Sequence, residues 1–75
     1  MKNLNNLDLG KEAVIDSFSD KDLALKLMEM GCLPGEKILI ERKAPLGDPI
    51  TISISGHLLS MRKSEAQTVL VNEIK

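Results

Sequence analysis

Apolar and polar residues alternate most clearly over residues 50–55, where Ile50, Ile52 and Ile54 take every second position. A period of two is typical of a β-strand with one buried face and one solvent-facing side. Residues 36–43 carry a similar pattern, with Ile38 and Ile40 on one face. The two segments predict a pair of strands joined by a loop over residues 44–49.

A helical period replaces this alternation after residue 19. Leu23, Leu27 and Met30 recur at spacings of four and three, so a helix would place them on one face. Ser19 and Asp22 resemble a weakened capping box, and acidic residues stabilise the positive start of a helix. The pattern predicts a helix that begins near residue 20 and ends shortly after Met30.

Shorter segments complete the set of elements. We expect a lead-in over residues 2–9 that docks on the core through its leucines, a strand within residues 11–16, and a strand around Leu58, Leu59 and Met61. A helical turn over residues 64–67, capped by Ser64, precedes a closing strand that runs from Val69 to Ile74. About five short strands and one helix favour a mainly β fold, a small and strongly bent antiparallel barrel, with residues 1–75 as a single domain.

Glycine and proline mark the ends of these elements. We expect Gly31 to close the helix with a positive φ, and Pro34 with Gly35 to turn the chain into the next strand. Pro45 and Pro49 bound the loop between the two alternating strands. These residues are interpreted as structural turns.

The loop over residues 44–49 is also a candidate contact surface, because exposed loops on a rigid scaffold often bind partners. Leu46 is an apolar residue in this loop and is followed by Gly47 and Asp48. Leu39 would extend the loop into an apolar patch if it lay on the same side. Leu39, Leu46, Gly47 and Asp48 are therefore the predicted partner-binding residues.

Composition limits the other classes of partner. The 75 residues carry a net charge of −1 and a single aromatic residue, so neither electrostatic attraction nor base stacking predicts binding to nucleic acid. No apolar run approaches the roughly 20 residues that cross a bilayer. The first ten residues lack the pattern of a signal peptide, and a cytoplasmic protein without direct membrane insertion is expected.

Candidate chemistry is sparse. His57 and Cys32, the only histidine and cysteine, stand 25 positions apart without a second pair, whereas structural zinc sites use about four ligands. His57 is thus a weak metal candidate, and a site shared across a dimer or built from surface carboxylates stays open. No motif supports nucleophilic catalysis, so an enzyme is not expected.

Four motifs in order resemble the FeoA family of bacterial ferrous iron transport. They are Leu27-x-x-Met30-Gly31, Pro34-Gly35, the run from Ala44 to Ile50, and Leu59-x-x-Arg62-Lys63-x-x-Ala66. The resemblance covers nearly the whole chain beyond its first residues. Two positions depart from the family pattern: Cys32 stands where leucine is usual, and Lys26 where arginine is frequent.

The resemblance implies an SH3-like barrel that serves as a non-enzymatic accessory protein to FeoB, the membrane transporter with a cytosolic GTP-binding domain. An alternative is a metal-binding or iron-responsive regulatory domain, similar to the C-terminal domain of iron-dependent repressors. The resemblance leaves open whether the chain binds a transition metal ion as a cofactor and whether it forms a weak homo-oligomer.

Overall fold

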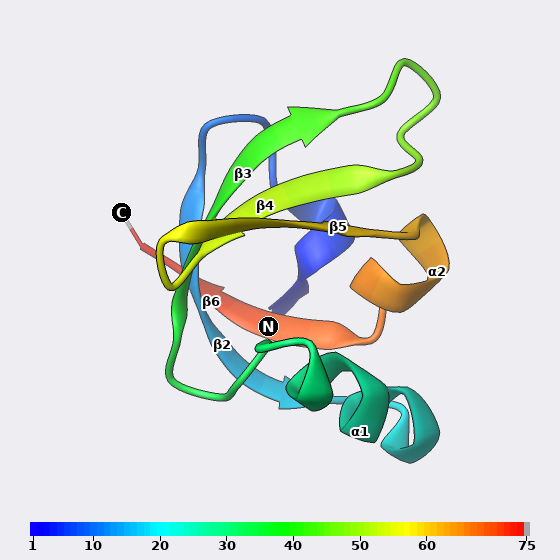
Figure 1. Ribbon diagram of the computed structural model, residues 1–75. Helices are drawn as coiled ribbons and strands as arrows, with labels where there is room; N and C mark the ends of the chain where they lie inside the picture. Colours follow the sequence, from blue (N-terminus) through cyan, green and yellow to red (C-terminus); the bar gives the residue numbers. More distant parts are fainter. Residues whose placement is uncertain (75) are drawn as a thin grey trace.

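The computed structural model describes residues 1–74. Its elements in chain order are β1 (Lys2–Asn3), the 3-10 helix η1 (Leu4–Asn6), β2 (Glu12–Phe18), α1 (Lys21–Glu29), β3 (Lys37–Lys43), β4 (Ile50–Ile54), β5 (His57–Met61), α2 (Lys63–Ala66) and β6 (Val69–Glu73). Within this range the strands form one antiparallel sheet in the order β1-β6-β2-β3-β4-β5. The sheet bends strongly (Figure 1), which confirms the expected barrel-like fold.

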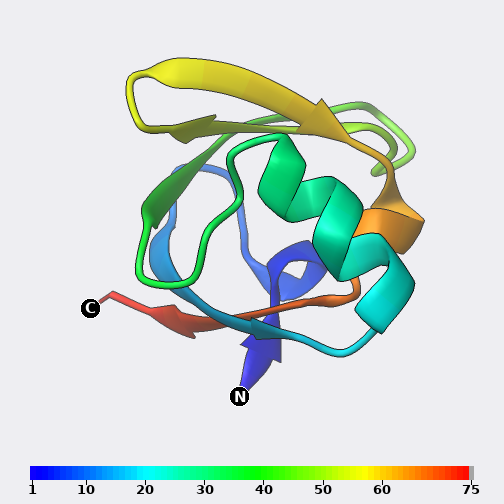
Figure 2. The same ribbon diagram turned by 60° about the horizontal axis from the view of Figure 1, so that its bottom comes forward.

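Two irregularities help the sheet to bend. The register of β2 against β6 shifts between Ile15 and Ser17, and that of β3 against β4 shifts between Ile40 and Arg42. Such bulges increase the local twist of a strand. The helix α1 lies across the opening between β5 and the β2–β6 pair, as Figure 2 shows.

The core is built from the alternating residues predicted above. Ile50, Ile52 and Ile54 of β4 are at most 1% exposed, and so are Ile38 and Ile40 of β3. Burial of each such side chain stabilises the fold by about 1.5–3 kcal/mol. The hydrophobic effect on one face of the sheet therefore accounts for the alternation in the sequence.

The lead-in also docks on this core, because Leu4 and Leu7 are almost completely buried. It contributes a strand that the sequence did not predict: β1 is only two residues long and pairs with β6 through its backbone. Leu9, in contrast, is 63% exposed. Ile74 lies just beyond the end of β6 and is 40% exposed, so the expected closing strand is slightly shorter than predicted.

The start of α1 differs from the predicted capping box. Asp20 is the cap, and its Oδ1 accepts hydrogen bonds from the backbone N–H groups of Asp22 and Leu23, at 2.9 and 3.1 Å. Ser19 does not cap the helix: its N–H donates to the carbonyl oxygen of Thr68, and its hydroxyl is directed to the same oxygen, at 3.5 Å. The predicted start near residue 20 is confirmed.

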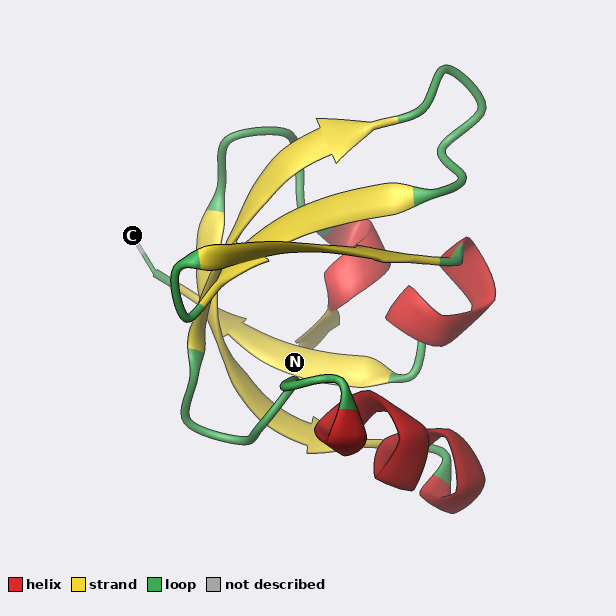
Figure 3. Ribbon diagram, viewed as in Figure 1, coloured by secondary structure: helices red, strands yellow, loops and turns green. Residues whose placement is uncertain are grey.

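Gly31 follows α1 with φ +103°, as expected for a left-handed helix end. On the apolar face of α1, Leu27 is buried, while Leu23 and Met30 are partly buried against the core. The α1–β3 and β3–β4 connections are the longer loops (Figure 3). None of the helices in residues 1–74 is long and apolar enough to cross a membrane.

The second helix begins one residue earlier than predicted. Ser64 lies inside α2, and Arg62 occupies the cap position. The reason is Glu65, whose Oε1 accepts a hydrogen bond from the backbone N–H of Arg62 at 2.8 Å. The prediction that Ser64 caps this helix is therefore wrong.

Candidate functional site

A surface groove of about 520 Å³ opens beside α1, at the end of β5. Three parts of the sequence meet here: α1, the β3–β4 loop, and the end of β5 with α2, which follows it after one residue. The lining residues are Lys26, Met30, Asp48, Pro49, Ser60, Met61, Arg62 and Glu65. This volume lies within the roughly 300–1,000 Å³ of typical ligand sites.

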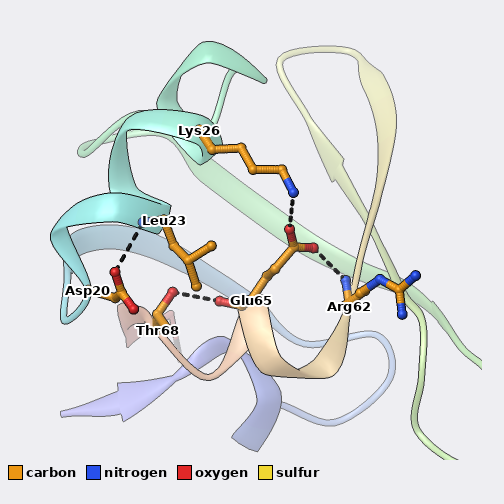
Figure 4. Close-up of polar contacts among 6 residues, drawn as sticks. All are labelled: Asp20, Leu23, Lys26, Arg62, Glu65 and Thr68. Carbon is orange, nitrogen blue, oxygen red and sulfur yellow. Dashed lines mark hydrogen bonds and ion pairs between the residues drawn. The ribbon is translucent and has the colours of Figure 1, made fainter.

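Glu65 is the polar centre of the groove (Figure 4). Its side chain is nearly buried, and its Oε2 lies 2.9 Å from the Nζ of Lys26, while Oε1 accepts the bond from the N–H of Arg62. The hydrogen bond from the Arg62 backbone, and then that from Lys26, hold the pKa of Glu65 below its usual value. The carboxylate is thus charged at neutral pH and ties α1 to the start of α2.

The β3–β4 loop is also bonded to the start of α2. Asp48 Oδ1 accepts a hydrogen bond from the backbone N–H of Lys63 at 3.1 Å. The peptide bond between Asp48 and Pro49 is cis. The loop, although exposed, is therefore fixed to α2 at the edge of the groove.

The guanidinium of Arg62 is exposed and points away from Glu65 in Figure 4. It forms neither a hydrogen bond nor an ion pair with any residue in the described range 1–74. The groove therefore presents one cation whose charge is not neutralised by contact with another side chain.

The predicted partner-binding residues fall on separate surfaces. Asp48 lines the groove, and Leu46 in the same loop is 91% exposed. Leu39 is half-buried and lines a different hollow of about 240 Å³ on the sheet, together with residues such as Glu12 and Lys37. Leu39 and Asp48 thus do not share a cavity, and their role in binding a partner stays a prediction.

Several groove residues were not among the predicted site residues. Met30 and Arg62 belong to the motifs quoted above, but the motifs assigned neither of them a role in binding. Lys26 and Glu65 lie 39 positions apart, and no local pattern links them. Their proximity follows from the fold.

The weak metal candidate is exposed at the start of β5. The His57 ring lies beside Gly31: a Cβ built on that glycine would be 3.7 Å from Cε1 and Nε2. Cys32 is buried, and burial raises the pKa of its thiol to about 11. Among residues 1–74, no three His, Cys, Asp or Glu side chains gather closely enough to hold a metal ion.

Residues 2–73 match the FeoA domain family. The chain belongs to the FeoA family. A FeoA-like protein from Clostridium acetobutylicum is 36% identical, with a TM-score of 0.91 over 99% of this chain and 87% of that one. FeoA from Stenotrophomonas maltophilia, solved in complex with zinc, is 28% identical, with a TM-score of 0.81 over 96% of this chain and 91% of that one. The latter is described as a prokaryotic SH3 domain protein and a candidate activating factor of ferrous iron transport, so the predicted family and the SH3-like fold of this FeoA chain are both confirmed.

The fold also occurs in larger proteins. A manganese-dependent transcriptional repressor has a TM-score of 0.88 at 14% identity, over 97% of this chain and 36% of the repressor. At this identity the likeness shows the fold alone. The FeoA family itself is linked to ferrous iron transport as an accessory domain and is not a known class of enzyme.

Proposed function

We propose that this FeoA chain is a non-enzymatic, cytoplasmic accessory protein that binds the cytosolic part of a FeoB-type transporter and influences ferrous iron uptake. One observation carries the proposal: three of the four motif segments meet at one groove. Lys26 bonds to Glu65 and Asp48 bonds to Lys63, so α1, the β3–β4 loop and α2 are held in fixed positions. A preorganised surface loses little entropy when a partner binds.

The contact surface that we propose includes the β3–β4 loop. Leu46 is the most exposed of the large apolar residues in the described chain, at 91%, and Gly47 and Asp48 follow it directly. An exposed leucine on a fixed loop can be buried by a partner at little conformational cost. Leu39 is a second, separate contact in this proposal.

A titration of the full chain with the cytosolic GTP-binding domain of the transporter tests the proposal. We expect saturable binding by calorimetry, measured with GDP and with a non-hydrolysable GTP analogue. The Leu46→Ser variant should bind more weakly, whereas Leu25→Ser is the matched control, because Leu25 is also exposed but lies on α1, outside the β3–β4 loop. If the wild type shows no interaction at high micromolar concentrations with either nucleotide, the proposal is wrong.

A metal-dependent role is the second candidate, favoured by the zinc complex of the Stenotrophomonas maltophilia relative. The donor groups of residues 1–74 do not fit a site within one chain, since no three of them gather. In this candidate, a metal ion is shared between two copies of the chain and His57 is one ligand. Anaerobic calorimetry with Fe²⁺ and Zn²⁺, combined with sedimentation, tests it: metal-dependent dimerisation should disappear in His57→Ala, and the absence of any binding heat would contradict it.

A further inference from the structure

The backbone of β5 is open on one side. β5 is the last strand of the sheet and pairs only with β4 among the strands of residues 1–74. Ser55 and Gly56 join the two strands with φ values of +49° and +81°, as in a two-residue type I′ turn. Ile54 and His57, which close this turn, are therefore a hydrogen-bonded pair.

The pairing then alternates along β5. Leu58 and Ser60 face β4 as non-hydrogen-bonded positions, so their N–H and C=O groups point toward the free edge. The hydroxyls of Ser60 and its partner Thr51 lie 3.0 Å apart, which agrees with the closer approach of side chains in such pairs. Two residues of β5 thus offer backbone donors and acceptors to another strand.

The groove lies at one end of this free edge, beside Ser60 and Met61. Ser60 and Met61 line it on the side of the strand, and Lys26 of α1 and Met30, the residue after this helix, line it on the other side. At the opposite end of β5, the His57 ring lies near Gly31, since a Cβ built on that glycine would be 3.7 Å from its Cε1 and Nε2 atoms. The groove therefore lies beside the end of β5 that leads into α2, and Figures 1 and 2 show this helix following the strand.

The charges of the groove determine which segment fits. The carboxylates of Asp48 and Glu65 already accept hydrogen bonds, and Lys26 is paired with Glu65. The guanidinium of Arg62 remains available for an anion. The partly buried side chain of Met30 supplies apolar surface beside it, whereas Met61, which also lines the groove, is almost completely buried in the core.

We propose that this groove binds an extended segment of the partner as an added strand on β5. The backbone of the segment bonds to Ser60 and Leu58, an apolar side chain packs on Met30, and an acidic side chain pairs with Arg62. The proposal rests on the proposed function, since the segment belongs to the cytosolic part of the transporter. Addition of a strand to a sheet edge is a general mode of peptide recognition.

A proline at position 60 tests the backbone contact. Edge strands accept proline where the N–H faces outward, so Ser60→Pro removes the donor while the sheet is retained. Ser60→Ala is the matched control, because it removes only the hydroxyl. Calorimetric titration with the cytosolic domain should show about tenfold weaker binding for Ser60→Pro and a much smaller loss for Ser60→Ala, which keeps the backbone N–H.

A charge reversal tests the ionic contact without altering the backbone. Arg62→Glu should weaken binding by about tenfold or more, and the loss should shrink at high salt. Arg42→Glu, an equal change at an exposed position outside the groove, should bind as the wild type does. Amide hydrogen exchange of the complex should show slower exchange at Leu58 and Ser60.

The outcomes separate the two proposals. A wild type that binds while both Ser60→Pro and Arg62→Glu bind equally well overturns the strand addition and leaves the proposed function standing. Slower exchange at Leu39 or Leu46, with none on β5, overturns it in the same way. A wild type that does not bind at all overturns the proposed function, and the strand addition with it.

Discussion

Replacing Glu65 should remove the contacts that join α1 to the start of α2. Glu65→Ala removes both the acceptor for the Arg62 N–H and the partner of Lys26. Glu65→Gln keeps an oxygen that can accept from Arg62 but removes the negative charge. The two variants therefore distinguish the capping hydrogen bond from the ion pair.

The size of each effect follows from the contacts. A hydrogen bond to a charged group contributes about 1.5–3 kcal/mol. Lys26 adds less, about 1 kcal/mol or below, because its side chain is 61% exposed and screened by solvent. We expect Glu65→Ala to lower the free energy of unfolding by about 2 kcal/mol, and Glu65→Gln by about 1 kcal/mol.

Urea and thermal unfolding at neutral pH measure both values. A loss of about 2 kcal/mol lowers the Tm of a domain of this size by roughly 8–16 °C. Glu29→Ala is the matched control: Glu29 is an exposed residue of α1 without a hydrogen bond or ion pair in the described range, and its replacement should change stability by less than about 0.5 kcal/mol. If Glu65→Ala is as stable as that control, the bridge between the helices does not stabilise the fold.

The contribution of Glu65 also depends on pH. Because the pKa of the carboxyl is lowered in the folded state, the stabilisation is complete above its ordinary value of 4.5 and is lost as the pH falls through the lower folded value. The difference in stability between wild type and Glu65→Gln should accordingly shrink in acid. A constant difference from neutral pH down to strongly acidic pH would contradict this reasoning.

Three further predictions concern the end of α1 and the core. Gly31→Val should lower stability by about 1 kcal/mol or more, since a β-branched residue is strained at φ +103°; an unchanged urea midpoint would argue against this. Leu27→Ala should cost about 2–5 kcal/mol, because the side chain is fully buried, and Leu25→Ala on the exposed side of α1 is its control. Cys32 should react with iodoacetamide only slowly near neutral pH in the folded protein and rapidly in guanidinium, because burial raises the pKa of its thiol to about 11; equal rates measured by mass spectrometry would show that the thiol is accessible.

The strands that the sequence predicts are those in which one face packs on the core. The alternation of Ile50, Ile52 and Ile54 records the burial of one side of β4, so a local pattern was sufficient. β1 leaves no such pattern, because two residues are held by backbone bonds to β6, at the other end of the chain. The formation of β1 depends on β6, which is too distant in the sequence to appear in a local pattern.

The caps and the site illustrate the same limit. Asp20 rather than Ser19 caps α1 because Ser19 is engaged by Thr68, 49 positions away. The motifs of the family pointed to the loop that carries Asp48, but its bond to Lys63 follows from the way β4 and β5 place the loop beside α2. The sequence motifs thus contain several residues of the groove, but only the tertiary structure brings these residues together.

The pairing of β1 with β6 has a consequence for how the protein is made. Lys2 stands opposite Val71, and its Nζ reaches the Oε1 of Glu73, a residue 71 positions later. Contacts between residues so distant in the sequence require closure of nearly the whole chain, which slows folding. During synthesis on the ribosome, β1 cannot pair with β6 until β6 has emerged. The surroundings of Leu4 are incomplete until then. The fold is therefore completed only after β6 has been translated.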